Sequence, residues 1–63
     1  MIELIIEQWS SLGGPVQFLW SAWRDGKRLE FSGPIKDAEK AETEGRAWCE
    51  TSLGQQPDKI TRL

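Results

Sequence analysis

The dipeptide Asp25-Gly26 is the sequence feature that most restricts how this chain can fold. Both residues readily adopt the positive φ that the two central positions of a type I′ β-turn require. The residues on either side alternate between apolar and polar side chains, which is the period of a β-strand. The sequence therefore predicts a β-hairpin with strands at 16–24 and 27–32.

This turn also predicts which side chains share a face of the hairpin, because a one-residue shift would move every side chain to the other face. The pairs on one face are mostly apolar: Arg24 with Lys27, Ala22 with Leu29, Trp20 with Phe31, and Phe18 with Gly33, with Val16 beyond them. The pairs on the other face are mixed: Trp23 with Arg28, Ser21 with Glu30, and Leu19 with Ser32. We therefore expect Trp20 in the core and Trp23 on the surface.

The first residues of the chain predict a further strand at 2–9. Isoleucine, a β-branched residue, occupies three of the first six positions, and such residues favour strands. Alternate side chains should face the core, namely Ile2, Leu4 and Ile6, and the others should face away, namely Glu3, Ile5, Glu7 and Trp9. Residues 10–15 end in Gly-Gly-Pro, which continues neither a strand nor a helix, so they predict a loop.

A helix is predicted over 38–53. Asp37 is suited to the N-cap, Ser32 is a competing start, and Gly54 is suited to a left-handed C-terminal cap. Small and apolar residues form one stripe at helical spacing: Ala38, Ala41, Gly45, Trp48, Cys49 and Leu53. A glycine inside a helix costs about 1 kcal/mol relative to alanine. We expect Gly45 to be compensated by a groove into which Trp20 or Phe31 presses. The alternative is that the helix merely tolerates this glycine.

These elements predict an α+β fold, a three-stranded antiparallel sheet with one helix on one face, in a single domain over residues 1–63. The tail 55–63, with Ile60 and Leu63 as its apolar anchors, either adds a short strand or lies against the core. A chain of 63 residues buries only about 60% of its unfolded surface, so it needs bulky core residues or a partner. Its four tryptophans and two phenylalanines supply that bulk.

The residue types argue against catalysis. The chain has no histidine, the commonest general base. Cys49 is the one candidate nucleophile, but it lies beside Glu50 near the helix C-terminus, where the helix dipole opposes a thiolate. One cysteine without histidine makes neither a disulfide within the chain nor a zinc site. We expect a structural Cys49, no enzymatic activity, and no metal or cofactor.

The chain carries no sign of a membrane or secretory protein. No apolar run approaches the roughly 18 residues of a membrane span, and residues 1–7 carry acids where a secretory signal carries bases. The single cysteine suits a reducing compartment. We therefore expect a soluble, cytoplasmic protein that has no membrane partner.

Charge is unevenly distributed along the chain, although the net charge is only −2. Residues 37–50 carry a balance of −3 and residues 24–28 a balance of +2, which predicts an acidic helix and a basic hairpin tip. The basic tip is a candidate contact for single-stranded nucleic acid, since cations can hold phosphates while a tryptophan stacks on a base. Its residues are Arg24, Lys27, Arg28 and Trp23. The alternative is that these basic residues only keep the turn soluble.

The sheet face away from the helix is the second candidate surface. It should carry tryptophan, leucine and arginine among polar residues, which is typical of an interface. The candidate partner-binding residues there are Trp9, Leu19, Trp23 and Arg28. Local packing is the alternative, with Trp23 over Arg28 as a cation–π pair and Trp9 against the 10–15 loop. Self-association of two chains through this face is a third prediction, and it is compatible with binding of a partner there.

A compact acidic domain of a few strands and one helix, without catalytic residues, resembles small phage-encoded inhibitors of bacterial defence, including anti-CRISPR proteins. The resemblance covers the whole chain and rests on its size, acidity and architecture. It implies a function by blocking, in which the helix carboxylates Glu39, Glu42 and Glu44 occupy a basic, nucleic-acid-binding surface on a target. The sequence thus predicts a non-catalytic protein-binding module, with nucleic-acid binding as the alternative.

Overall fold

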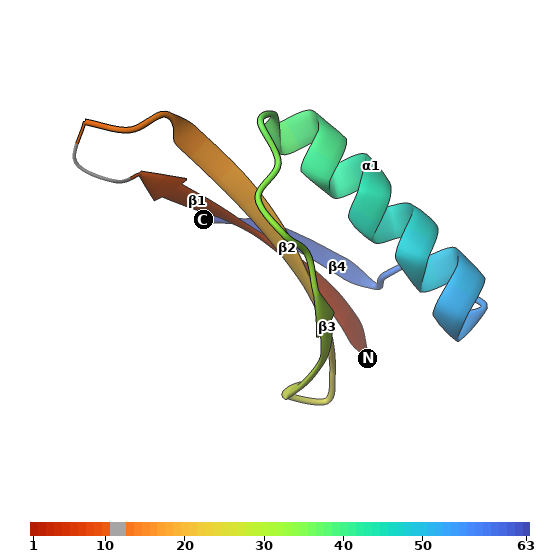
Figure 1. The fold of residues 1–63 in the computed structure, drawn as a ribbon. Helices are drawn as coiled ribbons and strands as arrows, with labels where there is room; N and C mark the ends of the chain where they lie inside the picture. The colour runs from red at the N-terminus through yellow and green to blue at the C-terminus, as the bar shows by residue number, and fades with distance from the viewer. Residues whose placement is uncertain (11–12) are drawn as a thin grey trace.

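The computed structural model describes residues 1–10 and 13–63, which form a sheet with one helix on one of its faces (Figure 1). Residues 11–12 of the predicted loop lie outside the described residues. The α+β class with a single helix is confirmed. The elements in chain order are β1 (Ile2–Ser10), β2 (Val16–Arg24), β3 (Lys27–Phe31), α1 (Ala38–Trp48), the π-helical turn η1 (Cys49–Leu53) and β4 (Lys59–Arg62).

The sheet has four strands in the order β3-β2-β1-β4 and is mixed rather than antiparallel throughout. β1 and β2 pair antiparallel, but β4 pairs parallel to β1, with Leu4 opposite Ile60. The tail therefore forms a strand, because α1 carries the chain back along the sheet so that β4 can run in the direction of β1. Asp58 anchors its start: the amide of Ile2 donates to Asp58 Oδ2 (2.7 Å), and the amide of Asp58 donates to the Ile2 carbonyl (2.8 Å).

The hairpin turns at Asp25-Gly26, as the sequence predicts. Asp25 has φ of 50° and Gly26 has φ of 83°, the positive values that a type I′ turn requires. Next to the turn, Arg24 pairs with Lys27 and Trp23 pairs with Arg28, so this part of the predicted register is confirmed.

A β-bulge changes the register beyond Trp23. Leu29 is the extra residue, so Ala22 pairs with Glu30 and Ser21 pairs with Phe31. The predicted pairs Ala22–Leu29, Ser21–Glu30 and Trp20–Phe31 are therefore wrong. The physical reason is that one inserted residue moves all later side chains of its strand to the other face. Phe31 consequently shares a face with Ser21, opposite the helix.

β3 ends at Phe31, and the residues after it do not continue the predicted register. The predicted pairs Leu19–Ser32 and Phe18–Gly33 are therefore also wrong. Ser32 lies opposite Trp20: its amide donates to the Trp20 carbonyl (2.9 Å) and its Oγ accepts from the Trp20 amide (2.9 Å). Phe18 pairs with Ile35 instead of Gly33, through two backbone hydrogen bonds of 2.7 and 2.8 Å. These contacts hold the segment that leads into α1 against the edge of β2.

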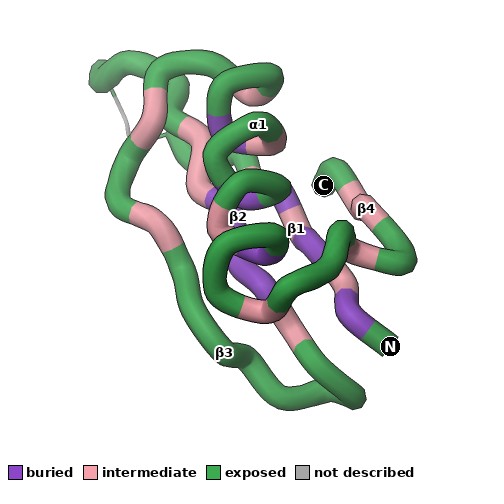
Figure 2. The backbone as a smooth tube through the Cα atoms, turned by 90° about the vertical axis from the view of Figure 1, so that its right-hand side faces the viewer, coloured by how far each residue is buried: buried purple, intermediate pink, exposed green. Residues whose placement is uncertain are grey.

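The core lies between α1 and the facing side of β1 and β2, where the buried segments gather (Figure 2). Its buried apolar residues are Ile2, Leu4, Ile6, Trp20, Ala22, Ala41 and Cys49. Trp48 from the end of α1 packs on Trp20 with ring centroids 5.7 Å apart. The strand faces predicted for residues 2–6, and the buried positions of Trp20 and Cys49, are confirmed.

Gly45 lies where the helix packs tightly against the sheet. A Cβ atom at this position would lie 2.6 Å from Leu4 Cδ1 and 3.2 Å from Trp20 Cγ. The predicted compensation for a glycine inside the helix is therefore confirmed for Trp20. The prediction that Phe31 could take the same place is wrong, because the bulge turns Phe31 to the other face.

Both ends of the helical segment have the predicted caps. Asp37 Oδ1 accepts a hydrogen bond from the Glu39 amide (2.8 Å), and so satisfies one amide of the first helical turn. Gly54 adopts a left-handed conformation with φ of 72°. The predicted range 38–53 matches α1 and η1 together, although its last five residues, Cys49–Leu53, are π-helical.

Glu42 ties α1 to β4. Its carboxylate accepts hydrogen bonds from Arg62 Nη2 (3.0 Å) and Nε (3.2 Å), and from Arg46 Nε (3.2 Å). The hydrogen bond from Arg62 lowers the pKa of Glu42 below its ordinary value of 4.5, and Arg46 adds to this effect, whereas partial burial opposes it. This cluster joins the last strand to the helix from the solvent side.

We expect Glu42→Gln to lower the free energy of unfolding at neutral pH by about 1 kcal/mol, since exposed ion pairs contribute little. Because the folded-state pKa of Glu42 lies below its unfolded value, its contribution is complete above pH 4.5 and is lost as the pH falls through the folded pKa. Urea unfolding of both proteins at about pH 7 and about pH 3 measures this. A difference that is equally large at the lower pH would contradict the role given to the charge.

Candidate protein-binding face

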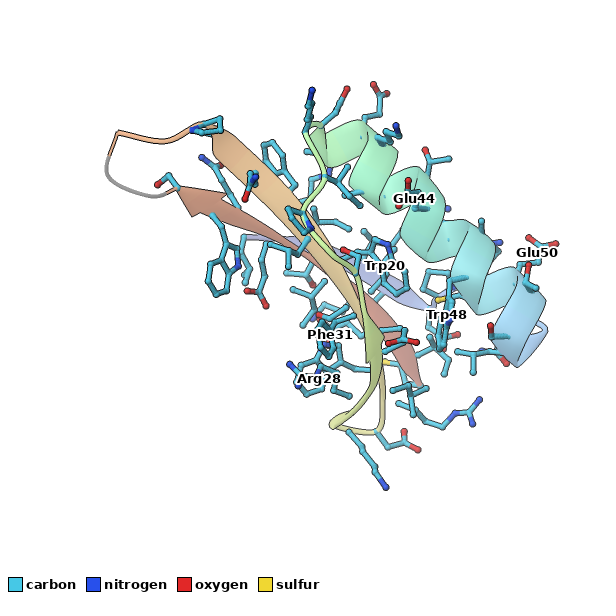
Figure 3. The ribbon with its side chains drawn as sticks, in the orientation of Figure 1. Trp20, Arg28, Phe31, Glu44, Trp48 and Glu50 are labelled. Atoms are coloured by element: carbon cyan, nitrogen blue, oxygen red, sulfur yellow. The ribbon has the colours of Figure 1, made fainter. Side chains whose placement is uncertain are left out.

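The face of the sheet opposite α1 is left uncovered by the helix, and we call it the open face. Strand alternation and the observed pairing place on it Glu3, Ile5, Glu7 and Trp9 from β1, Gln17, Leu19, Ser21 and Trp23 from β2, Arg28 and Phe31 from β3, and Lys59 and Thr61 from β4. Figure 3 shows Arg28 and Phe31 on this side of the sheet, whereas Trp20 and Trp48 lie on the helix side. The open face therefore carries both aromatic and charged side chains.

Two aromatic rings of the open face are largely accessible to solvent. Trp9 is 59% exposed and Phe31 is 57% exposed. Each ring has one polar contact: the Trp9 indole N–H donates to Glu7 Oε2 (3.1 Å), and the Arg28 guanidinium lies 4.6 Å from the centre of the Phe31 ring. These contacts orient the rings while leaving much of their surface uncovered.

A pocket of about 250 Å³ lies between the two rings. Leu19 and Ser21 contribute to its lining from β2, together with Trp20, while Glu7 and Trp9 line it from β1 and Arg28 and Phe31 from β3. Pockets that bind ligands or partner side chains are typically apolar with a few charged groups at defined positions. This pocket has that composition, with a carboxylate from one strand and a guanidinium from another.

Trp23 is more enclosed than the sequence predicts. It is half-buried, and its indole N–H donates to Ser21 Oγ (2.8 Å). The local-packing alternative predicts a cation–π contact of Arg28 with Trp23, but the guanidinium lies over Phe31 instead. Among the predicted residues, Trp9, Leu19 and Arg28 come together around the pocket, whereas Trp23 does not line it and instead donates its indole N–H to Ser21.

Phe31 is the residue of this site that sequence reasoning missed. The alternation Leu29-Glu30-Phe31 places Phe31 on the helix side, and only the bulge turns it to the open face. The one available signal was the basic residue Arg28, because a cation often lies over a nearby aromatic ring. The presence of Arg28 does not show whether its guanidinium lies over Phe31 or over Trp23.

The hairpin tip and the helix carry the remaining predicted residues. Arg24 and Lys27 are exposed at the turn. Glu39 and Glu44 are exposed on α1, and Glu44 lines a shallow pocket together with Lys40 and residues 32–36. Glu42 differs from them because it is held by Arg46 and Arg62. The acidic surface thus lies on the opposite side of the molecule from the open face.

Cys49 is fully buried, and this burial raises the pKa of its thiol, which disfavours the thiolate. Within residues 1–10 and 13–63, no group of three histidine, cysteine or acidic side chains is placed to hold a metal ion. Over the same residues, none of the helices has the length and apolar character needed to cross a membrane.

Comparison of the chain with protein-family models, with curated proteins and with solved structures finds no match. Function must therefore be inferred from the side chains and their placement. The open face combines exposed aromatic rings, a pocket and charges of both signs on one sheet.

Proposed function

We propose that this protein is a non-catalytic protein-binding module that engages its partner through the open face. The observation that carries the proposal is the pair of exposed rings, Trp9 and Phe31, on either side of the pocket. Tryptophan and arginine are enriched among the residues that dominate binding energy, and such residues gather around pockets. Phe31 with Arg28 over it, and Trp9 with Glu7 beside it, form two anchors of this kind.

Burial of the two rings is the largest energetic term available to this surface. Covering their exposed halves removes roughly 200 Å² of aromatic surface from water, which contributes about 5 kcal/mol at 25 cal/mol per Å². An exposed ion pair at the rim contributes at most about 1 kcal/mol. Affinity should therefore depend on Trp9 and Phe31, while Glu7 and Arg28 determine orientation and selectivity.

The proposal is tested by replacing both rings. We expect the Trp9→Ser/Phe31→Ser variant to remain folded and to lose most of the partner that the immobilised wild-type protein captures from a lysate of its host cell. Val16→Ser is the matched control. Val16, in β2, is an exposed apolar residue like Trp9 and Phe31, but its side chain lies on the helix side of the sheet and not on the open face. Quantitative mass spectrometry measures capture, and circular dichroism measures folding. Equal capture by all three proteins would contradict the proposal.

The resemblance to phage-encoded inhibitors gives this module a second surface, the acidic side of α1. In that form of the proposal the exposed carboxylates of Glu39 and Glu44 occupy a basic surface on the target. The same capture experiment tests it with Glu39→Lys/Glu44→Lys. Glu42 is left unchanged, because reversing its charge would also break its contacts with Arg46 and Arg62. Loss of capture in this variant alone would place the target on the helix rather than on the open face.

The nucleic-acid alternative retains Arg24 and Lys27 at the exposed tip. The placement of Trp23 and Arg28 opposes it: Trp23, the ring on which a base would stack, is half-buried with its indole N–H bonded to Ser21 Oγ, and the Arg28 guanidinium lies over Phe31. We expect tryptophan fluorescence to stay unchanged when single-stranded DNA or RNA is added at low salt. A change that weakens steeply with added salt would favour nucleic-acid binding instead.

A further inference from the structure

We propose that the partner for which the open face is built is a second copy of this chain, bound face to face in a two-fold symmetric dimer. This inference rests on the proposed function, since it names the occupant of the same surface. The distribution of charge, the pairing of unlike groups and the size of the face all support it.

Charge on the open face is balanced, although the protein as a whole is acidic. Glu3 and Glu7 from β1 share this face with Arg28 from β3 and Lys59 from β4, whose partner across the sheet is Glu3. A surface for a strongly acidic or strongly basic partner would carry one sign of charge. Equal numbers of acids and bases instead suit a surface that meets an identical copy.

Approach through the open face also keeps the acidic helices apart. The exposed acids Glu39 and Glu44 belong to α1, on the helix side of the sheet, and Figure 3 shows Glu50 at the end of the helical segment pointing away from the sheet. In a face-to-face dimer the two sheets pack about 10 Å apart with a helix outside each, so the acidic surfaces are separated by on the order of 30 Å, several times the ~8 Å Debye length.

The arrangement of groups around the pocket allows each copy to complement the other. Glu7 and Arg28 come from the strands on either side of β2, with Leu19 and Ser21 between them. In a two-fold interface, contacts occur in equivalent pairs. If the two-fold axis lies in the plane of the interface and passes between Glu7 and Arg28, Glu7 of each copy faces Arg28 of the other. The exposed rings of each copy then cover the apolar pocket of the other.

The size of the face suits such a dimer. The Cα atoms extend over 39 × 20 × 15 Å, so a face that runs the length of the molecule has a footprint of roughly 600–800 Å², close to the about 800 Å² per partner of a standard interface. The core is small, with seven buried apolar residues among the described ones. A partner subunit is one of the usual ways in which such a short chain gains stability.

Sedimentation equilibrium of the whole chain at about 1 µM and about 100 µM tests this inference, since interfaces of this size bind at micromolar affinity or tighter. We expect the apparent mass to reach twice that of one chain at the higher concentration. Trp9→Ser/Phe31→Ser should remain a monomer there, and Val16→Ser should dimerise like the wild type. A wild-type protein that is monomeric at both concentrations, or a double-serine variant that still dimerises, would overturn the inference.

A charge exchange tests the predicted pairing directly. Glu7→Arg and Arg28→Glu should each weaken dimerisation at least tenfold, because like charges then meet twice in the symmetric interface. Glu7→Arg/Arg28→Glu restores unlike pairs, so it should recover most of the lost affinity. If the double variant is as weak as the single ones, the proposed arrangement of the two copies is wrong.

Failure of this inference can be distinguished from failure of the proposed function. If the chain is monomeric but its captured partner is lost on replacing Trp9 and Phe31, the open face binds a different protein and only the dimer is rejected. If neither self-association nor capture depends on these two residues, both proposals are rejected.

Discussion

Gly45→Leu should lower the free energy of unfolding by about 3 kcal/mol, at the upper end of the usual cost of overpacking a core. A Cβ at this position already lies 2.6 Å from Leu4 Cδ1 and 3.2 Å from Trp20 Cγ, and leucine adds three more carbon atoms. Neither neighbour has free space to enter, since Leu4 is fully buried and Trp20 is only 6% exposed. The helix must therefore move away from the sheet or lose its packing.

Ala47→Leu is the matched control for this substitution, because Ala47 is an exposed residue of the same helix. Leucine has a higher helix propensity than glycine and nearly that of alanine, so propensity cannot explain a loss at either position. We expect Ala47→Leu to change the stability by less than about 0.5 kcal/mol in urea unfolding. Similar losses at the two positions would contradict the close approach of helix and sheet at Gly45.

Leu4→Ala should cost about 3 kcal/mol, within the 2–5 kcal/mol range for removing a large aliphatic side chain from a core. Leu4 is 0% exposed and packs against Gly45. Because glycine has no side chain that could fill the space left by the removed methyl groups, the substitution leaves a cavity under the helix. Domains of this size are stable by only a few kcal/mol, so a large share of the variant should be unfolded at 25 °C. Thermal unfolding followed by circular dichroism measures this.

Val16→Ala is the control for Leu4→Ala, since Val16 is an exposed aliphatic residue and should lose little. The contact with Gly45 can be tested in the same background. With the Leu4 methyl groups removed, Gly45→Ala should raise stability by about 1 kcal/mol through its helix propensity. If Gly45→Ala has the same effect with and without Leu4→Ala, the two positions are not coupled and the packing described for them is wrong.

The sequence alone was sufficient for features that depend on neighbouring residues. Asp25-Gly26 has the conformational freedom that the turn needs, and the caps Asp37 and Gly54 act within one helical turn of their own position. The stripe of small and apolar residues likewise predicts which side of the helix is buried, because helical periodicity is a local property. For the candidate site, the sequence correctly brought Trp9, Leu19 and Arg28 onto one face.

The direction of β4 and the position of Phe31 were decided only in the tertiary structure. β4 is parallel to β1 because α1 returns the chain along the sheet and Asp58 binds the backbone of Ile2, a contact between residues that are distant in sequence. The bulge at Leu29 has no local sequence mark, yet it moves Phe31 from the expected core to the open face. The hairpin turn could thus be predicted from two residues, because its conformation is local. The aromatic surface beyond it could not, because one inserted residue in the pairing of two strands determines which face a side chain takes.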